Sequence, residues 1–217
     1  MAAEPSSRVP PEPWSQNKHY HRLILDAVPP GCQRALDVGC GTGDLTRRLR
    51  ERVPQVTGID RDRGSVAHAR GNPGAGDIVY LLGDFRAAPF QPESVDLVAS
   101  IAALHHMDAA AALRQMASLL RPGGVLAVVG LCRGVTPSDL GRLVPAVAGT
   151  RWHLAANAWR RRGMARPYQP PIVWPPPLTY PAMRCLAERL LPGVRYQRHL
   201  YWRYSLVWAK PVPPPAA

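Results

Sequence analysis

The stretch ALDVGCGTG, residues 35–43, decides the fold of this chain. Apolar residues and one aspartate, Asp37, run into a glycine-rich turn, after which Leu45, Leu49 and Val53 recur at helical spacing. A buried strand, a tight glycine loop and a helix together open a nucleotide-binding βαβ unit. Glycines let a ligand approach the backbone closely, and the first N–H groups of the following helix can serve that ligand. The alternative is a turn that only joins a strand to a helix.

The residue after this loop argues against a bound pyrophosphate. A dinucleotide-binding loop reads G-x-G-x-x-G, and its third glycine, counted from Gly39, would fall at Asp44. A negative side chain at the start of a helix would repel a pyrophosphate. The spacing is instead G-x-G-x-G preceded by Asp37, which resembles motif I of the class I methyltransferases that use S-adenosylmethionine (SAM). The resemblance implies that Asp37, Gly39, Cys40 and Gly41 contribute to a SAM site.

An acidic residue ends the second predicted strand. Asp60 lies 17 residues after Gly43, where nucleotide-binding folds use a carboxylate to accept hydrogen bonds from ribose hydroxyls. The neighbouring Arg61 is expected in the same site. Since SAM and NAD both carry this ribose, Asp60 indicates a nucleotide without choosing between the two. The alternative for Asp60 is a helix N-cap.

A further acidic residue, Asp84, follows the third predicted strand. In the methyltransferase pattern an acid at this place accepts a hydrogen bond from the adenine amine, which suits a carboxylate because it only accepts. The next residue, Phe85, would offer its backbone N–H and an apolar face to the ring. The alternative is a polar turn residue at a strand end. The carboxyl ends of successive strands are where open α/β sheets bind ligands.

The fourth predicted strand leads into Ser100, Ile101 and a pair of histidines. The run DLVAS…LHHMD…LRPGG, within residues 96–124, resembles the middle of the small-molecule methyltransferase family (type 11, UbiE-like) that includes quinone and natural-product enzymes. The match extends over residues 35–131 and implies that Ser100 and Ile101 contribute to the cofactor site. Enzymes that methylate amino groups of DNA or RNA bases carry Asp/Asn-Pro-Pro-aromatic here, whereas this chain reads SIAA.

His105 and His106 are the candidate catalytic residues. Methyl transfer requires nucleophile, methyl and sulfur to be held in line. A hydroxyl or ring-carbon acceptor must also lose a proton, and histidine suits that task because its pKa lies near neutrality. We expect one of the two, His105 rather than His106, to act as general base. The alternative is that both are structural, capping the helix or bonding backbone.

The pattern predicts an α/β fold: a Rossmann-like, seven-stranded, mostly parallel sheet with helices on both faces and a C-terminal antiparallel hairpin. Residues 1–13 are expected to be a disordered tail, 14–210 a single methyltransferase domain, and 211–217 a C-terminal tail. Within the domain, 14–30 is expected to form a lid helix that brings Tyr20 to the cofactor, and 134–180 an insertion that caps the substrate. The predicted strands are 35–38, 56–59, 78–82, 94–99, 125–131, 194–200 and 203–210, and the helices include 44–52, 62–70 and 181–190.

The composition of the chain argues against a polyanionic partner, a metal site and a membrane span. The net charge of +12 comes almost wholly from arginine, which a GC-rich coding sequence would also produce, so it is discounted as a sign of a polyanionic partner. The Arg160–Arg162 run is read as a solvated helix face, ahead of an anion-binding role. Four well-separated cysteines predict free thiols, without a zinc site or other metal. No membrane span or signal peptide is apparent, which predicts a cytoplasmic protein.

These features predict a SAM-dependent methyltransferase that acts on an oxygen, nitrogen or carbon atom of a small molecule in natural-product metabolism. The expected partner is a small-molecule methyl acceptor, with no membrane and no nucleic acid, and the expected assembly is a monomer or homodimer. The alternatives are an RNA-directed methyltransferase, a non-catalytic SAM-binding module, and an NAD oxidoreductase, which Asp44 and the terminal hairpin disfavour. The acceptor atom is left open.

Overall fold

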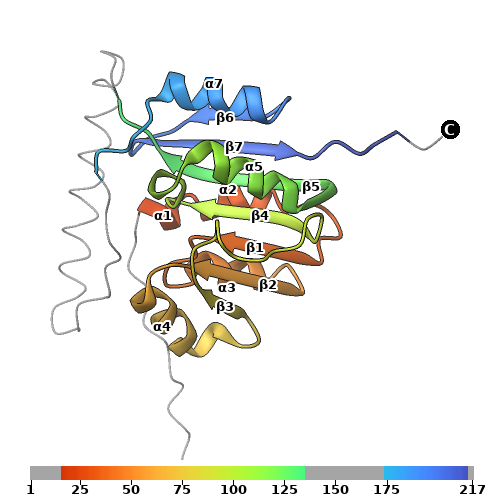
Figure 1. Cartoon of the computed structure of the whole chain (residues 1–217). Coiled ribbons are helices and arrows are strands. Elements are labelled where there is room, and N and C mark those ends of the chain that lie inside the picture. Colours follow the sequence, from red (N-terminus) through yellow and green to blue (C-terminus); the bar gives the residue numbers. More distant parts are fainter. Residues whose placement is uncertain (1–15, 135–173, 215–217) are drawn as a thin grey trace, which may run out of the picture.

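The strands form one sheet in the order β3-β2-β1-β4-β5-β7-β6 (Figure 1). The computed structural model describes residues 16–134 and 174–214. The first five strands are parallel: β1 (Arg34–Val38), β2 (Gln55–Asp60), β3 (Val79–Leu82), β4 (Val95–Ile101) and β5 (Leu120–Leu131). The last two, β6 (Arg195–Arg198) and β7 (Arg203–Ala209), pair antiparallel with each other, and β7 pairs antiparallel with β5. The predicted fold class is therefore confirmed.

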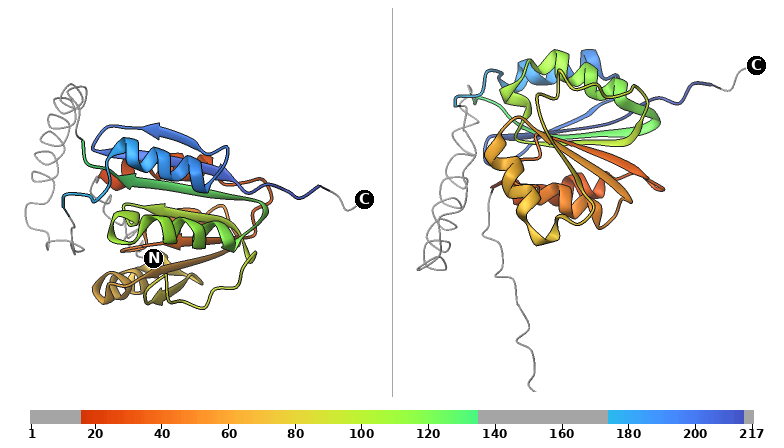
Figure 2. Two further views of the ribbon diagram at one scale, coloured as in Figure 1. Left: turned by 45° about the horizontal axis from the view of Figure 1, so that its top comes forward. Right: turned by 60° about the horizontal axis from the view of Figure 1, so that its bottom comes forward.

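Helices cover both faces of the sheet (Figure 2). On one face lie α2 (His21–Asp26), α3 (Asp44–Arg50) and α4 (Arg63–Gly71). On the other lie α5 (Ala109–Leu119) and α7 (Tyr180–Leu190). The chain changes face between β1 and β4, which are neighbours in the sheet but not in sequence. Ligands of doubly wound α/β folds bind at the carboxyl ends of the strands beside such a switch point.

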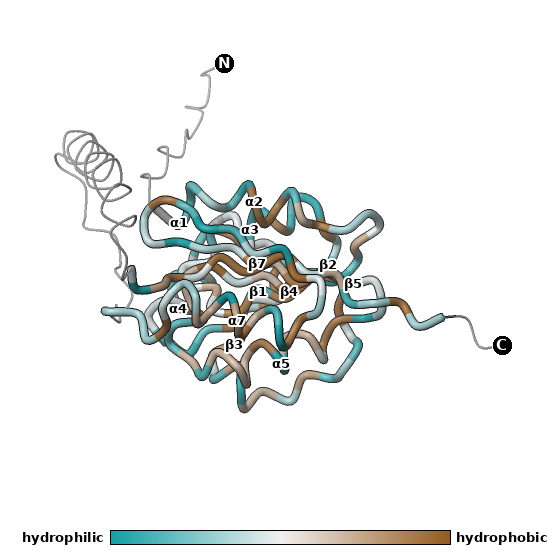
Figure 3. The backbone as a smooth tube through the Cα atoms, turned by 90° about the horizontal axis from the view of Figure 1, so that it is seen from above, coloured by the Kyte–Doolittle hydropathy of each residue, from teal (hydrophilic) through white to brown (hydrophobic). Residues whose placement is uncertain are grey.

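The central strands are apolar on both sides because helices cover them twice. Figure 3 shows the hydrophobic colour concentrated in the strands at the middle of the molecule. Alternate strand residues pack against α5 and α7, among them Leu36, Val38, Val98, Leu126 and Val128. The residues between them pack against α2 and α3, among them Ala35, Leu97, Ala99 and Ala127. This double burial holds the strand ends in fixed relative positions.

The predicted N-terminal helix is wrong in one respect, since it is two short helices. α1 (Gln16–His19) and α2 are separated at Tyr20. The hydroxyl of Tyr20 donates a hydrogen bond to the carbonyl of Leu200, 2.8 Å away, in the turn between β6 and β7. The chain therefore breaks where its aromatic side chain is fixed to the far end of the sequence.

The predicted start of the fifth strand is also wrong. The sequence pattern predicts a strand from residue 125, yet β5 already begins at Leu120. The backbone of Gly123 donates to the carbonyl of Lys210, and Lys210 donates back to Gly124, at 2.9 and 2.8 Å. This pairing with the chain beyond β7 draws the glycine segment into the sheet, and Gly123 supplies the positive φ of +80° that it requires.

The other predicted helices and strands begin and end within two residues of the observed bounds. The terminal hairpin is confirmed, and the four cysteines are free thiols. Two 3₁₀ turns complete the described elements, η1 (Pro73–Ala75) and η2 (Leu104–His106). Among the described residues, no helix combines the length and apolar character needed to cross a membrane. The predicted N-terminal tail and most of the insertion, including the Arg160–Arg162 run, lie outside the described residues.

Candidate active site

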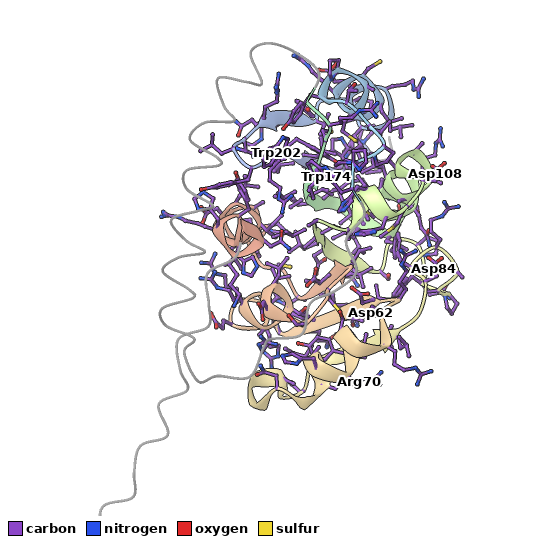
Figure 4. All side chains as sticks on the ribbon, turned by 90° about the vertical axis from the view of Figure 1, so that its left-hand side faces the viewer. Asp62, Arg70, Asp84, Asp108, Trp174 and Trp202 are labelled. Atoms are coloured by element: carbon purple, nitrogen blue, oxygen red, sulfur yellow. The ribbon has the colours of Figure 1, made fainter. Side chains whose placement is uncertain are left out.

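The predicted site residues gather at the edge of the sheet where the parallel strands end. The glycine loop follows β1, Asp60 ends β2, Asp84 follows β3 and the histidine pair follows β4. Figure 4 views the molecule from this side and labels Asp62, Asp84 and Asp108, which follow β2, β3 and β4. Residues that are far apart in the sequence meet here because the strands are parallel and in register.

The glycine loop is shaped by three left-handed residues. Gly39, Gly41 and Gly43 have φ values of +73°, +54° and +80°. A Cβ added to Gly39 would lie 2.1 Å from the Cβ of Ala103, whereas one added to Gly41 would meet nothing within 4 Å. Gly39 is therefore needed for packing against the segment after β4. Gly41 leaves open space over the loop, which a ligand can use.

Asp37 supports the loop from beneath. Its side chain is 1% exposed, and its carboxylate accepts a hydrogen bond from the hydroxyl of Thr46 on α3, at 2.7 Å. Burial raises the pKa of Asp37 to about 7, against the lowering effect of the Thr46 hydrogen bond, and the charge of Asp60 raises it further. The structure thus buries this predicted cofactor residue behind the loop, where it joins β1 to α3.

Cys40 also points inward. Its side chain packs with Val66, Ala69 and Tyr80 under α4, and burial is the main cause that raises the pKa of its thiol. The backbone N–H groups of Gly39 and Cys40 both donate to the carbonyl of Ile59, at 2.8 and 3.1 Å. The thiol is therefore part of the core, and the backbone N–H groups of Gly39 and Cys40 are already bound within the protein.

Asp60 organises the loop through both of its carboxylate oxygens. One accepts a hydrogen bond from the backbone of Gly41 and the other from that of Asp62, each at 2.8 Å. The N-cap of α4 is Asp62, whose carboxylate accepts from the N–H of Ser65. The N-cap alternative for Asp60 is therefore wrong. Each oxygen retains a second lone pair, so the half-buried carboxylate can also accept from a ribose hydroxyl.

Asp84 and Phe85 take opposite positions after β3. The Asp84 side chain is exposed, and one of its oxygens accepts from the backbone of Arg86 at 2.8 Å. Phe85 is 3% exposed and packs in the core, with its ring 6.1 Å from that of Phe90. The N–H of Gly83 donates to the carbonyl of Asp60, which links the ends of β2 and β3. Asp84 can therefore meet a ligand, whereas the Phe85 ring lies inside.

The end of β4 is held against β1. Ser100 is fully buried, and its hydroxyl donates to the carbonyl of Val38 at 2.8 Å. Ile101 is buried beside it, and Ala102 has a positive φ of +55°, which is unusual for a residue with a Cβ. Ser100 and Ile101 thus fix the strand end, and the turn at Ala102 directs the chain toward the histidines.

His105 and His106 lie side by side in η2, with ring centroids 4.1 Å apart. The Nδ1 atom of each is buried and has no hydrogen-bond partner in the described part of the chain, while Asp108 caps the helix that follows. Burial lowers the pKa of His105 to about 4, helped by the charges of His106 and Arg203. Burial also lowers the pKa of His106, and Arg61 adds to that effect while Asp60 opposes it. Because both pKa values are lowered from that of an ordinary histidine, both imidazoles are neutral at pH 7.

The N-terminal helix α1 contacts both the glycine-loop side and the C-terminal-hairpin side of the site. On α1, Lys18 forms an ion pair of 3.0 Å with Asp44, the first residue of α3 after the glycine loop. Asn17, also on α1, accepts a hydrogen bond from Arg203 at the start of β7, at 2.7 Å. Tyr20 is 6% exposed, and burial raises its pKa to about 12. The structure thus fixes Tyr20 within this connection, on the C-terminal hairpin.

Sequence reasoning missed three residues of this region. Thr46 and Ala103 hold Asp37 and Gly39, and Arg203 stands at the strand edge, where its charge influences the pKa of His105. None of the three carries a local signal. Arg203 in particular is one basic residue among many, and only the pairing of β7 with β5 brings it to the ends of the parallel strands.

The known proteins that this chain resembles are methyltransferases. A family model described as a methyltransferase domain matches residues 36–128. An uncharacterized methyltransferase of Mycobacterium tuberculosis (strain ATCC 25618 / H37Rv) is 39% identical over 208 residues, covering 93% of this chain and 99% of the relative. Malonyl-[acyl-carrier protein] O-methyltransferase of Salmonella typhimurium is 39% identical over 103 residues, covering 47% of this chain and 40% of the relative. A crystal structure of a SAM-dependent methyltransferase from Methanosarcina mazei has the same fold, with a TM-score of 0.59 at 17% identity over 88% of this chain and 98% of that one.

Proposed function

The chain belongs to the class I SAM-dependent methyltransferases, and from that premise we propose that it methylates an oxygen, nitrogen or carbon atom of a small molecule in natural-product metabolism. The observation that carries the proposal is the pair of neutral imidazoles at the end of β4, each with an unpartnered Nδ1. A second support is the ring pair of Trp174 and Trp202, whose centroids lie 5.7 Å apart and which Figure 4 labels on the same side of the molecule. Aromatic walls suit an organic acceptor.

The residues at the strand ends fit SAM. Space lies open over Gly41, and the carboxylates of Asp60 and Asp84, at the ends of neighbouring strands, can accept hydrogen bonds from ribose hydroxyls and from an adenine amine. We assign the loop backbone of residues 39–43, Asp60 and Asp84 as the groups that hold the cofactor. Asp37, Cys40, Ser100 and Ile101 support these groups from within. When bound, SAM supplies an electrophilic methyl group on a sulfonium.

The chain's own contribution to the reaction is to orient the acceptor and remove its proton. His105 is our candidate base, because the charge of Arg203, on the hairpin, influences its pKa, whereas Arg61 and Asp60 of the cofactor side influence the pKa of His106. A neutral ring nitrogen of His105 would accept the proton that a hydroxyl or carbon acceptor loses on methylation. His106 then orients the His105 ring, against which it packs.

Replacing His105 with alanine is expected to lower kcat by ~100-fold or more, because a positioned general base contributes about that factor to proton transfer. The dissociation constant for S-adenosylhomocysteine is expected to stay within ~2-fold, since His105 is not placed against the cofactor. The matched variant His106→Ala should lower kcat less. Methyl transfer at saturating SAM measures the first effect and calorimetry the second. Full turnover in both variants would refute the assignment of a histidine base.

The pH profile offers a separate test of His105. Only the neutral imidazole can accept a proton, and a histidine is neutral above its pKa. Because burial holds the pKa of His105 at about 4, we expect kcat to stay level from pH 8 down to about pH 5. An ordinary imidazole would lose half its activity near pH ~6.5. Measuring kcat at saturating SAM keeps the titration of Asp37 out of the binding step. An acidic limb centred near neutral pH would contradict the assignment.

Transfer of a labelled methyl group tests the proposed function directly. The protein would be incubated with SAM carrying a trideuterated methyl group and with three fractions of cells that naturally produce it: small molecules, RNA and protein. Mass spectrometry would then locate the label. We expect it in the small-molecule fraction. Label in RNA or protein alone, or in no fraction, would overturn the proposal.

A further inference from the structure

The guanidinium of Arg203 is buried without an acidic partner. The residue is 4% exposed, and its Nη2 donates to the side-chain oxygen of Asn17 at 2.7 Å. Its Nε and Nη1 atoms are buried and have no hydrogen-bond partner among the residues that the structure describes. These two nitrogens carry three of the five N–H donors of an arginine. Within residues 16–134 and 174–214, no carboxylate forms an ion pair with this side chain. A buried charge that lacks hydrogen-bond and ion-pair partners is costly unless another group, such as a ligand, binds it.

Arg203 lies at the same edge of the sheet as the candidate active site. Arg203 is the first residue of β7 and pairs with Leu131, the last residue of β5, so it stands at the edge where the parallel strands end. It lies near enough to His105 for its charge to help lower the pKa of that imidazole. The side chains of Tyr20 and Tyr180 also interact electrostatically with the Arg203 guanidinium.

The charge of Arg203 persists under working conditions. Burial lowers its pKa to about 10, and the two tyrosines oppose that effect, so the guanidinium is protonated at neutral pH. Arg203 therefore adds a fixed cation to a site that holds two neutral imidazoles and an aromatic pair. If Arg203 served only to fasten α1 through Asn17, an uncharged amide could make the same contact without the cost of a buried charge.

We infer that Arg203 binds an anionic oxygen group, a carboxylate or a phosphate, on the methyl acceptor. The inference rests on the methyl-transfer function proposed above and names the chemical class of its substrate. Guanidinium N–H groups match the oxygens of such anions, and a charge-assisted hydrogen bond in a buried place is strong. The anion would orient the acceptor between Arg203 and His105 and thereby present its reactive atom to the base.

Fractionating the natural small-molecule extract tests this inference. The extract would be passed over an anion-exchange resin, and the retained and unretained fractions would each be assayed with trideuterated SAM. We expect the labelled product from the retained fraction. Product from the unretained fraction alone would overturn the anionic class while leaving the proposed function intact, whereas product from neither would overturn the proposed function itself. Treating the retained fraction with phosphatase separates the two sources: activity is lost for a phosphate and kept for a carboxylate.

Variants of Arg203 test its role with the acceptor so obtained. Arg203→Met is expected to raise the KM for the acceptor by ~100-fold, because the anion loses a charge-assisted partner. The affinity for S-adenosylhomocysteine should stay within ~2-fold, since Arg203 does not meet the cofactor. Arg203→Lys keeps the charge and should raise KM by only ~10-fold. The matched control is Arg195→Met, an exposed arginine on the neighbouring strand β6, which should change neither value. A KM that is unchanged in both Arg203 variants, or a neutral acceptor analogue that binds as tightly as the acid, would overturn the assignment.

Discussion

Replacing Gly39 with alanine is expected to weaken binding of S-adenosylhomocysteine by at least ~100-fold and to lower the free energy of unfolding by ~2–4 kcal/mol. The new methyl group would lie 2.1 Å from the Cβ of Ala103, and the backbone at this position has a φ of +73°. The loop after β1 and the turn after β4 would have to separate. Because these two segments form adjoining walls of the site, the binding surface would change with them. Calorimetric titration and denaturant unfolding measure the two effects.

Two other glycine variants serve as comparisons for the Gly39→Ala prediction. Gly71→Ala, at the end of α4, meets no atom within 4 Å and should leave stability and binding unchanged. Gly41→Ala is equally free of clashes in the protein, but its φ of +54° adds strain of ~1 kcal/mol. Its added methyl group would enter the space over the loop, so we expect it to weaken binding more than it lowers stability. If Gly39→Ala behaved like Gly71→Ala, the packing of the loop against Ala103 would be contradicted.

The second large effect is expected from Asp60→Asn, which should weaken binding of S-adenosylhomocysteine by ~100-fold. Both carboxylate oxygens of Asp60 accept backbone N–H groups, from Gly41 and Asp62. An amide offers only one oxygen, so its NH₂ group would face one of these donors. The variant also loses the charge that makes Asp60 a strong acceptor for a ribose hydroxyl. Calorimetry with S-adenosylhomocysteine measures the affinity.

The control for this prediction is the same substitution at an exposed acid. Asp77 forms an ion pair of 2.9 Å with Arg50 on the surface, and such exposed pairs contribute little to stability because water and salt screen them. Asp77→Asn should therefore bind S-adenosylhomocysteine as the wild type does. Equal affinities of wild type, Asp60→Asn and Asp77→Asn would remove Asp60 from the cofactor site.

Most of the fold could be predicted because its signals are local. Apolar runs, glycine turns and aspartate caps placed the strands and helices, and the parallel arrangement followed from their alternation. The two errors have non-local causes. The helix broken at Tyr20 depends on a hydrogen bond to Leu200, and the early start of β5 depends on backbone pairing with Lys210. Neither contact can be inferred from the neighbouring sequence.

In the candidate site, too, some residues could be predicted from the local sequence and others could not. The positions of Asp60, at the end of β2, and of Asp84, just after β3, could be predicted because the carboxyl ends of parallel strands meet at one edge of the sheet. Their contact with a cofactor stays a prediction. The sequence does not say which way a side chain turns at such an end. Asp37, Cys40, Ser100 and the Phe85 ring lie inside, where they support the site from beneath. Arg203 escaped prediction because its importance arises only when β7 pairs with β5.

The most direct test of this account is a crystal structure of the protein bound to S-adenosylhomocysteine. We expect the nucleoside to lie over the loop of residues 39–43, with a ribose hydroxyl donating to the carboxylate of Asp60 and the adenine amine near Asp84. We also expect the sulfur to face the side of the site that holds His105. A nucleoside bound away from this loop, or a ribose that makes no contact with Asp60, would contradict the assignment of the strand ends as the methyl-transfer site.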